Sequence, residues 1–129
     1  MKLASAIDRI AGETTLRPKV YLEVNIGEEQ SKHGFRAEEL RASLDELLEL
    51  KNLSLLGLMC LPPKVSHPEE ARPWFAKVRM LKEDLEKRAG RIFPGLSMGM
   101  SGDFEVAIEE GSTIVRVGSA IFGTRSQVL

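Results

Sequence analysis

Hydrophobic and polar residues alternate along this chain with two different periods. In residues 20–26 every second side chain is aliphatic, which predicts a β-strand with one apolar face, and Tyr21, Glu23 and Asn25 lie on the other face. That polar face must contact water or a ligand. Residues 2–11 instead carry apolar side chains at helical spacing, and we expect the glycine that follows to stop the helix.

The same alternation of helix and strand continues to the end of the chain. We expect helices over residues 37–50, 68–89 and 103–110, and strands over residues 53–61, 96–100 and 113–117, the last running toward Phe122. Strands that alternate with helices of this length pair in parallel through right-handed crossovers. The expected fold class is α/β, in a single domain that spans residues 1–129.

Two architectures fit this order of elements, an open doubly wound sheet and an arc of a (β/α)8 TIM barrel. Phosphate sites of such barrels recur in the loops after the last two strands, and the turns Ser101-Gly102 and Gly118-Ser119 follow the last two strands here. The turn after residue 26 is no dinucleotide fingerprint. We therefore favour an arc of a barrel, with four β/α units, because four strands cannot close a complete barrel, which has eight strands and about 250 residues.

The two small-residue turns are the first candidates for a ligand site. Backbone amides and the hydroxyls of Ser101 and Ser119 could close around a phosphate, with the N-terminus of the helix after Gly102 adding its dipole. The alternative for Ser101 is an ordinary helix cap. We also expect Ser97, Gly99 and Ser101 to share one strand face and leave volume for a ligand, the alternative being close helix packing.

Arg116 stands in an otherwise apolar strand, where a guanidinium needs a compensating partner. One alternative to a ligand is a structural ion pair with Glu23. Cys60 lies within an apolar strand and is expected to be a small core residue. His33 and His67 belong to separate loops and offer no metal-ligand spacing.

Composition excludes several other classes of protein. The net charge is −1, and the 18 basic and 19 acidic residues are interspersed, so neither nucleic acid nor an anionic membrane surface is an expected partner. A single cysteine rules out an internal disulfide framework. The sequence shows neither an apolar run long enough to span a bilayer nor a signal-peptide pattern, so a cytoplasmic location is expected.

Four segments together resemble the YggS/PROSC family of pyridoxal phosphate homeostasis proteins, namely residues 25–35, 57–63, 96–101 and 115–123. The resemblance covers essentially the whole chain and implies a barrel of the alanine racemase N-terminal type. It also implies binding of pyridoxal 5'-phosphate, which this family buffers or delivers. The chain looks like only the second half of that barrel.

The resemblance also assigns roles to particular residues. It implies a cofactor site made of Met100, Ser101, Gly102, Arg116, Gly118 and Ser119. In that site the two turns hold the phosphate and Arg116 faces the pyridine nitrogen. Met100 precedes the first turn and could line the ring pocket, the alternative being an ordinary packing side chain. The family usually has threonine where Ser119 stands. The family's Schiff-base lysine, in a Val-Ser-Lys-type motif, has no counterpart here, and Lys32 is expected to be a solvated loop lysine, so any cofactor binding is expected to be non-covalent.

The sequence therefore favours a cofactor-binding homeostasis protein over an enzyme. Two alternatives remain open at this stage. One is a structural half-barrel that binds no cofactor, and the other is a relative of pyridoxal phosphate-dependent amino-acid racemases, which would need a lysine base and an opposing acid. Because four parallel strands leave two open edges, we also expect a homodimer or association with the missing N-terminal half.

Overall fold

The computed structural model describes residues 1–126. Its single sheet contains four parallel strands in the spatial order β1-β2-β3-β4. Their bounds are β1 Lys19–Val24, β2 Ser54–Cys60, β3 Gly95–Met100 and β4 Ile114–Arg116. A doubly wound sheet reverses its strand order at a switch point, whereas here the sequence order is kept throughout. The topology is therefore that of an arc of a barrel.

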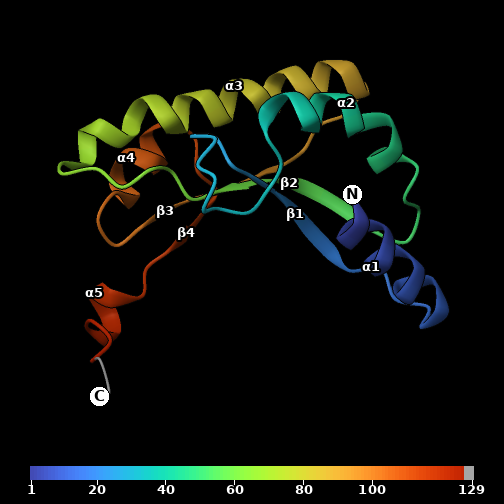
Figure 1. Cartoon of the computed structure of the whole chain (residues 1–129), viewed down its shortest axis with the longest axis horizontal. Coiled ribbons are helices and arrows are strands. Elements are labelled where there is room, and N and C mark those ends of the chain that lie inside the picture. The colour runs from blue at the N-terminus through green and yellow to red at the C-terminus, as the bar shows by residue number, and fades with distance from the viewer. Residues whose placement is uncertain (127–129) are drawn as a thin grey trace.

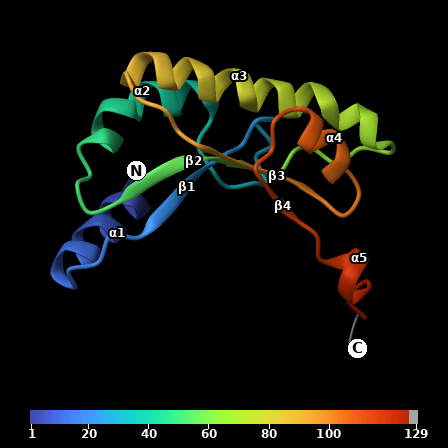
Figure 2. The ribbon, with the colours of Figure 1, turned by 180° about the vertical axis from the view of Figure 1, so that it is seen from behind.

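Helices cover only one face of this arc. The helices are α1 Lys2–Glu13, α2 Ala37–Leu48, α3 Arg72–Ala89, α4 Phe104–Glu109 and α5 Ser119–Phe122, with a 3-10 turn, η1, at Pro68–Ala71. In Figures 1 and 2, α2, α3 and α4 lie on one side of the sheet, while α1 lies beside the start of β1 and α5 projects beyond the end of β4. The other face corresponds to the lumen face of a barrel, and we call it the open face.

The core lies between the sheet and the helices. Each of the first three strands buries alternate side chains toward α2 and α3, as a period of two requires. These are Leu22, Val24, Leu58, Cys60, Leu96 and Met98, which pack in one cluster with Phe75, Val78, Leu81 and Leu85 of α3. The expectation that Cys60 is a core residue is confirmed, since its side chain is fully buried.

The first helix does not stop at Gly12 as expected but continues to Glu13. Gly12 instead provides room for a neighbouring side chain, because a Cβ there would lie 2.7 Å from Asn52 Nδ2. The Asn52 backbone N–H donates to Asp8 Oδ1 at 2.8 Å, and its Nδ2 donates to Asp8 O at 3.1 Å. The absence of a side chain at Gly12 thus lets Asn52 reach α1 and bond to Asp8, and the glycine does not end the helix.

The last strand is also shorter than expected. Strand β4 ends at Arg116, and the chain that was expected to run on toward Phe122 turns at Gly118 into α5. The N–H groups of Ile121 and Phe122 both donate to Gly118 O. The neighbouring strand β3 ends at Met100, the register partner of Arg116, so the ladder offers no partner beyond that point.

The backbone conformation of Gly99 turns this position of β3 toward α4. Its φ is +99°, and the register of β3 against β4 shifts between Ser97 and Met100. A Cβ at Gly99 would lie 2.6 Å from the Cβ of Ala107 in α4. The expectation that Ser97, Gly99 and Ser101 share one face is therefore wrong for Gly99, because this position serves close packing against α4.

Candidate functional site

The two predicted turns meet at the carboxyl edge of the sheet. The backbone N–H of Ala120, at the start of α5, donates to Ser101 Oγ at 3.1 Å. This contact joins the turn after β3 to the turn after β4, although the two residues lie 19 positions apart. Parallel strands end at the same edge of a sheet, so adjacent strands bring their following turns together.

Ser101 does not cap the helix that follows it. The N-cap of α4 is Asp103, and Asp103 Oδ1 accepts a hydrogen bond from the backbone N–H of Met100 at 2.8 Å. The carboxylate of Asp103 therefore holds the turn in shape and leaves the hydroxyl of Ser101 directed toward the other turn. It also places one negative charge on the α4 side of the site.

Open space surrounds the glycines of both turns. A Cβ added to Gly102 or to Gly118 would meet nothing within 4 Å. Ser119 is exposed and is the first residue of α5, so its backbone N–H has no partner within the helix. Each turn thus carries a serine hydroxyl beside a glycine that lies against open space.

Arg116 extends from β4 across the sheet to the end of β2. Its Nη2 donates to Cys60 O at 2.8 Å, while its Nε is buried and has no hydrogen-bond partner. The alternative of an ion pair with Glu23 is not observed among the described residues. A buried donor without a partner costs about 1–3 kcal/mol, which makes this Nε a candidate contact for a ligand.

Met100 lies beside this arginine. The two residues are partners in the β3–β4 register, and Met100 is 47% exposed even though it follows five buried strand residues. Met100 therefore places an exposed apolar side chain at the end of β3, directly before the turn Ser101-Gly102. The sequence could only suggest this position.

Neither a reactive thiol nor a metal centre is found near these residues. Burial raises the pKa of the Cys60 thiol to about 12, and the nearby positive charge of Arg116 only partly offsets that effect. The thiol is therefore protonated at neutral pH and does not act as a nucleophile. Within residues 1–126, no cluster of three or more His, Cys, Asp and Glu side chains could hold a metal ion.

The prediction that Lys32 is a solvated loop lysine is wrong. Its Nζ lies 2.6 Å from Glu29 Oε2 and donates to the carbonyl oxygens of Pro62 at 3.0 Å and Leu61 at 3.4 Å. Lys32 therefore ties the loop after β1 to the loop after β2. These contacts link positions about 30 residues apart, and the sequence gives no sign of them.

Asn25 closes the same loop from its other end. Its side-chain Nδ2 donates to Glu29 O at 2.7 Å, and its Oδ1 accepts from the Glu29 backbone N–H at 3.1 Å. The polar residue that ends the β1 pattern is thus buried and satisfied by its own loop. Together with Lys32, it holds the loop after β1 against the loop after β2.

Comparisons with known proteins agree with this architecture. The chain matches the family described as "Alanine racemase, N-terminal domain" over residues 1–126. It is 46% identical to the pyridoxal phosphate homeostasis protein of Aquifex aeolicus over 95% of this chain and 54% of that protein. It is 34% identical to the protein of the same name from Synechocystis, over 97% of this chain and 57% of that protein. The chain thus spans about half the length of these relatives.

Solved structures give the same result. PipY of Synechococcus elongatus with pyridoxal phosphate bound superposes with a TM-score of 0.85 at 36% identity, over 95% of this chain and 57% of PipY. An alanine racemase of Clostridium difficile superposes with a TM-score of 0.76 at 19% identity, over 98% of this chain and 33% of that chain, which shows a shared fold. The four-stranded arc therefore corresponds to part of a barrel of the alanine racemase type.

Proposed function

This chain belongs to the alanine racemase N-terminal domain family, and we propose that it supplies the phosphate-binding and ring-facing part of a pyridoxal 5'-phosphate site. The proposed residues are Met100, Ser101, Gly102, Arg116, Gly118 and Ser119. The names of the curated relatives and the cofactor in PipY support this choice of ligand. In the proposed role, the protein binds and releases the cofactor in pyridoxal phosphate homeostasis.

The observation that carries the proposal is the hydrogen bond between the Ala120 N–H and Ser101 Oγ. It brings the turn after β3 against the turn after β4, which supports the proposal that donors from both turns serve one small ligand. A phosphate ester needs several donors at once, and hydrogen bonds to a charged acceptor are about twice as strong as neutral ones. The hydroxyls of Ser101 and Ser119 and the open space at Gly102 and Gly118 meet this need.

Arg116 fits the other end of such a ligand. Its buried Nε lacks a partner, and its Nη2 donates to Cys60 O, so the guanidinium is held in place with its Nε–H still available to a ligand. Bound pyridoxal phosphate would supply an aldehyde that reacts with amines and a ring that withdraws electrons. An arginine at the ring nitrogen would keep that nitrogen unprotonated, which suits holding the cofactor better than driving carbanion chemistry.

A four-stranded arc does not enclose a ligand. We therefore include in the proposal that full affinity requires further β/α units over the open face, from a second copy or from a segment equivalent to the rest of the relatives' barrel. Within residues 1–126, no helix is both long and apolar enough to cross a membrane.

Calorimetric titration with pyridoxal 5'-phosphate and with inorganic phosphate tests the proposal. Replacing both Ser101 and Ser119 with alanine should weaken both ligands by about 1–3 kcal/mol, because two hydroxyl donors are lost. The matched control replaces the exposed Ser5 and Ser66, which lie outside the site, with alanine. The proposal fails if the unmodified chain binds neither ligand or if both double variants bind equally well.

A further inference from the structure

Asp103 closes the turn that carries Ser101 and Gly102. Its backbone N–H donates to Met100 O at 3.1 Å, and its side-chain Oδ1 accepts from the Met100 N–H at 2.8 Å. Its own carbonyl oxygen accepts from the Ala107 N–H at 3.0 Å, so the same residue also begins α4. The side chain that fixes the shape of this turn is therefore a carboxylate.

No cationic side chain neutralises the charge of Asp103. Among the ion pairs of residues 1–126, none includes this carboxylate. The carboxylate stands at the positive end of the α4 dipole, so that end is not free to attract a second anion. Burial raises the pKa of the Cys60 thiol, and the charge of Asp103 acts in the same direction, so its field reaches the end of β2.

A phosphate held by Ser101 would lie close to this charge. A four-residue turn such as the one from Met100 to Asp103 spans less than about 7 Å between its end Cα atoms. This span is shorter than the Debye length, which is about 10 Å at 0.1 M salt. The carboxylate therefore repels a phosphate in this turn at ordinary salt concentrations, although it also holds the turn in shape.

We propose that Asp103 has two opposite effects on the phosphate end of the site: its hydrogen bonds shape the turn, and its charge limits the affinity for phosphate. The inference rests on the proposed function and adds a means of release to it. An asparagine would keep the first effect and lose the second, because its amide oxygen accepts the same hydrogen bond and asparagine caps helices about as well as aspartate. The charge at this position thus lowers affinity for a ligand that has to be given up again.

Calorimetric titration of Asp103→Asn tests the inference with three ligands: pyridoxal 5'-phosphate, inorganic phosphate, and pyridoxal, which has no phosphate. At low ionic strength the variant should bind both phosphate-bearing ligands at least threefold more tightly than the unmodified chain, while pyridoxal binding stays the same. The gain should disappear in 1 M sodium chloride, where the Debye length is about 3 Å. A purely structural role for Asp103 would give no such dependence on salt.

Two further variants separate the charge from the hydrogen bond. Glu46→Gln removes the same charge at an exposed position on α2 and should leave all three affinities unchanged. Asp103→Ala removes both the charge and the bond to the Met100 N–H, so it should bind inorganic phosphate at least threefold more weakly than Asp103→Asn does. Circular dichroism confirms that each variant folds.

The outcomes also separate this inference from the proposed function. If the unmodified chain binds phosphate but Asp103→Asn binds it no more tightly, or gains equally for pyridoxal, or keeps its gain in 1M salt, the role of the charge is overturned and the proposed function stands. Equal phosphate affinity in the Asn and Ala variants would overturn the role of the hydrogen bond. If the unmodified chain binds neither pyridoxal 5'-phosphate nor inorganic phosphate, the proposed function fails, and this inference fails with it.

Discussion

The ring of Tyr21, on β1, lies against the backbone of Gly95, two strands away on β3. A Cβ placed on Gly95 would stand 2.5 Å from Tyr21 Cε1. Gly57 on β2 is the register partner of both residues and leaves the ring free to cross. The three residues lie side by side on the open face, at the end of the sheet opposite the proposed phosphate-binding turns.

This contact predicts that Gly95→Ala destabilises the fold. The added methyl collides with the phenol ring, and overpacking of this kind costs about 1–3 kcal/mol. Chemical denaturation measures the effect, with Gly102→Ala as the control because its added methyl meets open space. In a double-mutant cycle, Tyr21→Ala should remove most of the cost of Gly95→Ala. Additive costs would show that the two residues do not interact.

A second prediction separates the two ends of the proposed ligand. Arg116→Leu should weaken pyridoxal 5'-phosphate binding about tenfold, because the ring loses a fixed donor, while inorganic phosphate binding stays unchanged. The double variant of Ser101 and Ser119 should weaken both ligands. Parallel titrations with the two ligands provide the measurement. Equal losses for both ligands in Arg116→Leu would place the arginine at the phosphate instead.

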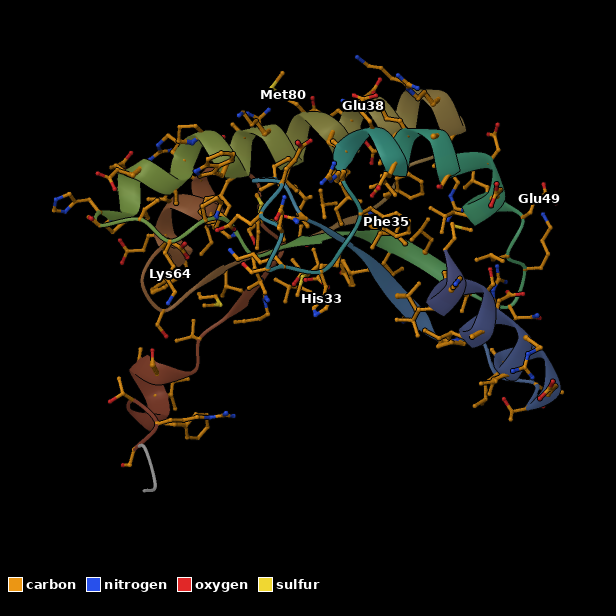
Figure 3. All side chains as sticks on the ribbon, viewed as in Figure 1. His33, Phe35, Glu38, Glu49, Lys64 and Met80 are labelled. Carbon is orange, nitrogen blue, oxygen red and sulfur yellow. The ribbon has the colours of Figure 1, made fainter. Side chains whose placement is uncertain are left out.

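A third prediction concerns covalent labelling. Lys32 is held by Glu29 and by two carbonyl oxygens, so its amine is not free to attack the cofactor aldehyde. Borohydride reduction in the presence of pyridoxal 5'-phosphate, followed by peptide mass spectrometry, should find no lysine that is modified stoichiometrically. Lys64, exposed in the loop after β2, serves as the internal comparison (Figure 3). Quantitative modification of Lys32 alone would contradict this prediction.

A fourth prediction concerns acid stability. Hydrogen bonds from Arg72 and Arg79 hold the pKa of Glu110 below its usual value of 4.5 and tie the end of α4 to α3. A carboxylate with a lowered pKa stabilises the fold above its unfolded pKa, and this stabilisation is lost as the pH falls through the folded pKa. Glu110→Gln should therefore lower stability near neutral pH and flatten its decline below about pH 4.5.

Denaturation midpoints between pH 3 and pH 7 measure this effect. Glu46→Gln, on the exposed side of α2, is the matched control and should keep the shape of the unmodified pH profile. If both variants follow the same profile as the unmodified chain, the Glu110 ion pairs do not contribute to stability. The result would then be typical of solvent-exposed ion pairs, which contribute little.

Periodicity alone was enough to predict the alternation of helices and strands. The polar and apolar faces of residues 20–26 required a strand, and the position of small residues after the last two strands indicated a barrel-type ligand edge. These features are local, because side-chain direction repeats every two residues in a strand and about every 3.6 in a helix. The family resemblance and the parallel arc are consistent with them.

Only the tertiary structure decided how the residues of the candidate site come together. The bond from Ala120 to Ser101, the bond from Arg116 to Cys60 and the brace from Lys32 to Pro62 join residues 19, 56 and 30 positions apart. Gly99 has a positive φ, which turns this position toward α4. The close approach of Ala107 in α4 leaves no room for a side chain there. Such contacts arise from the packing of separate elements, which no local pattern of residues encodes.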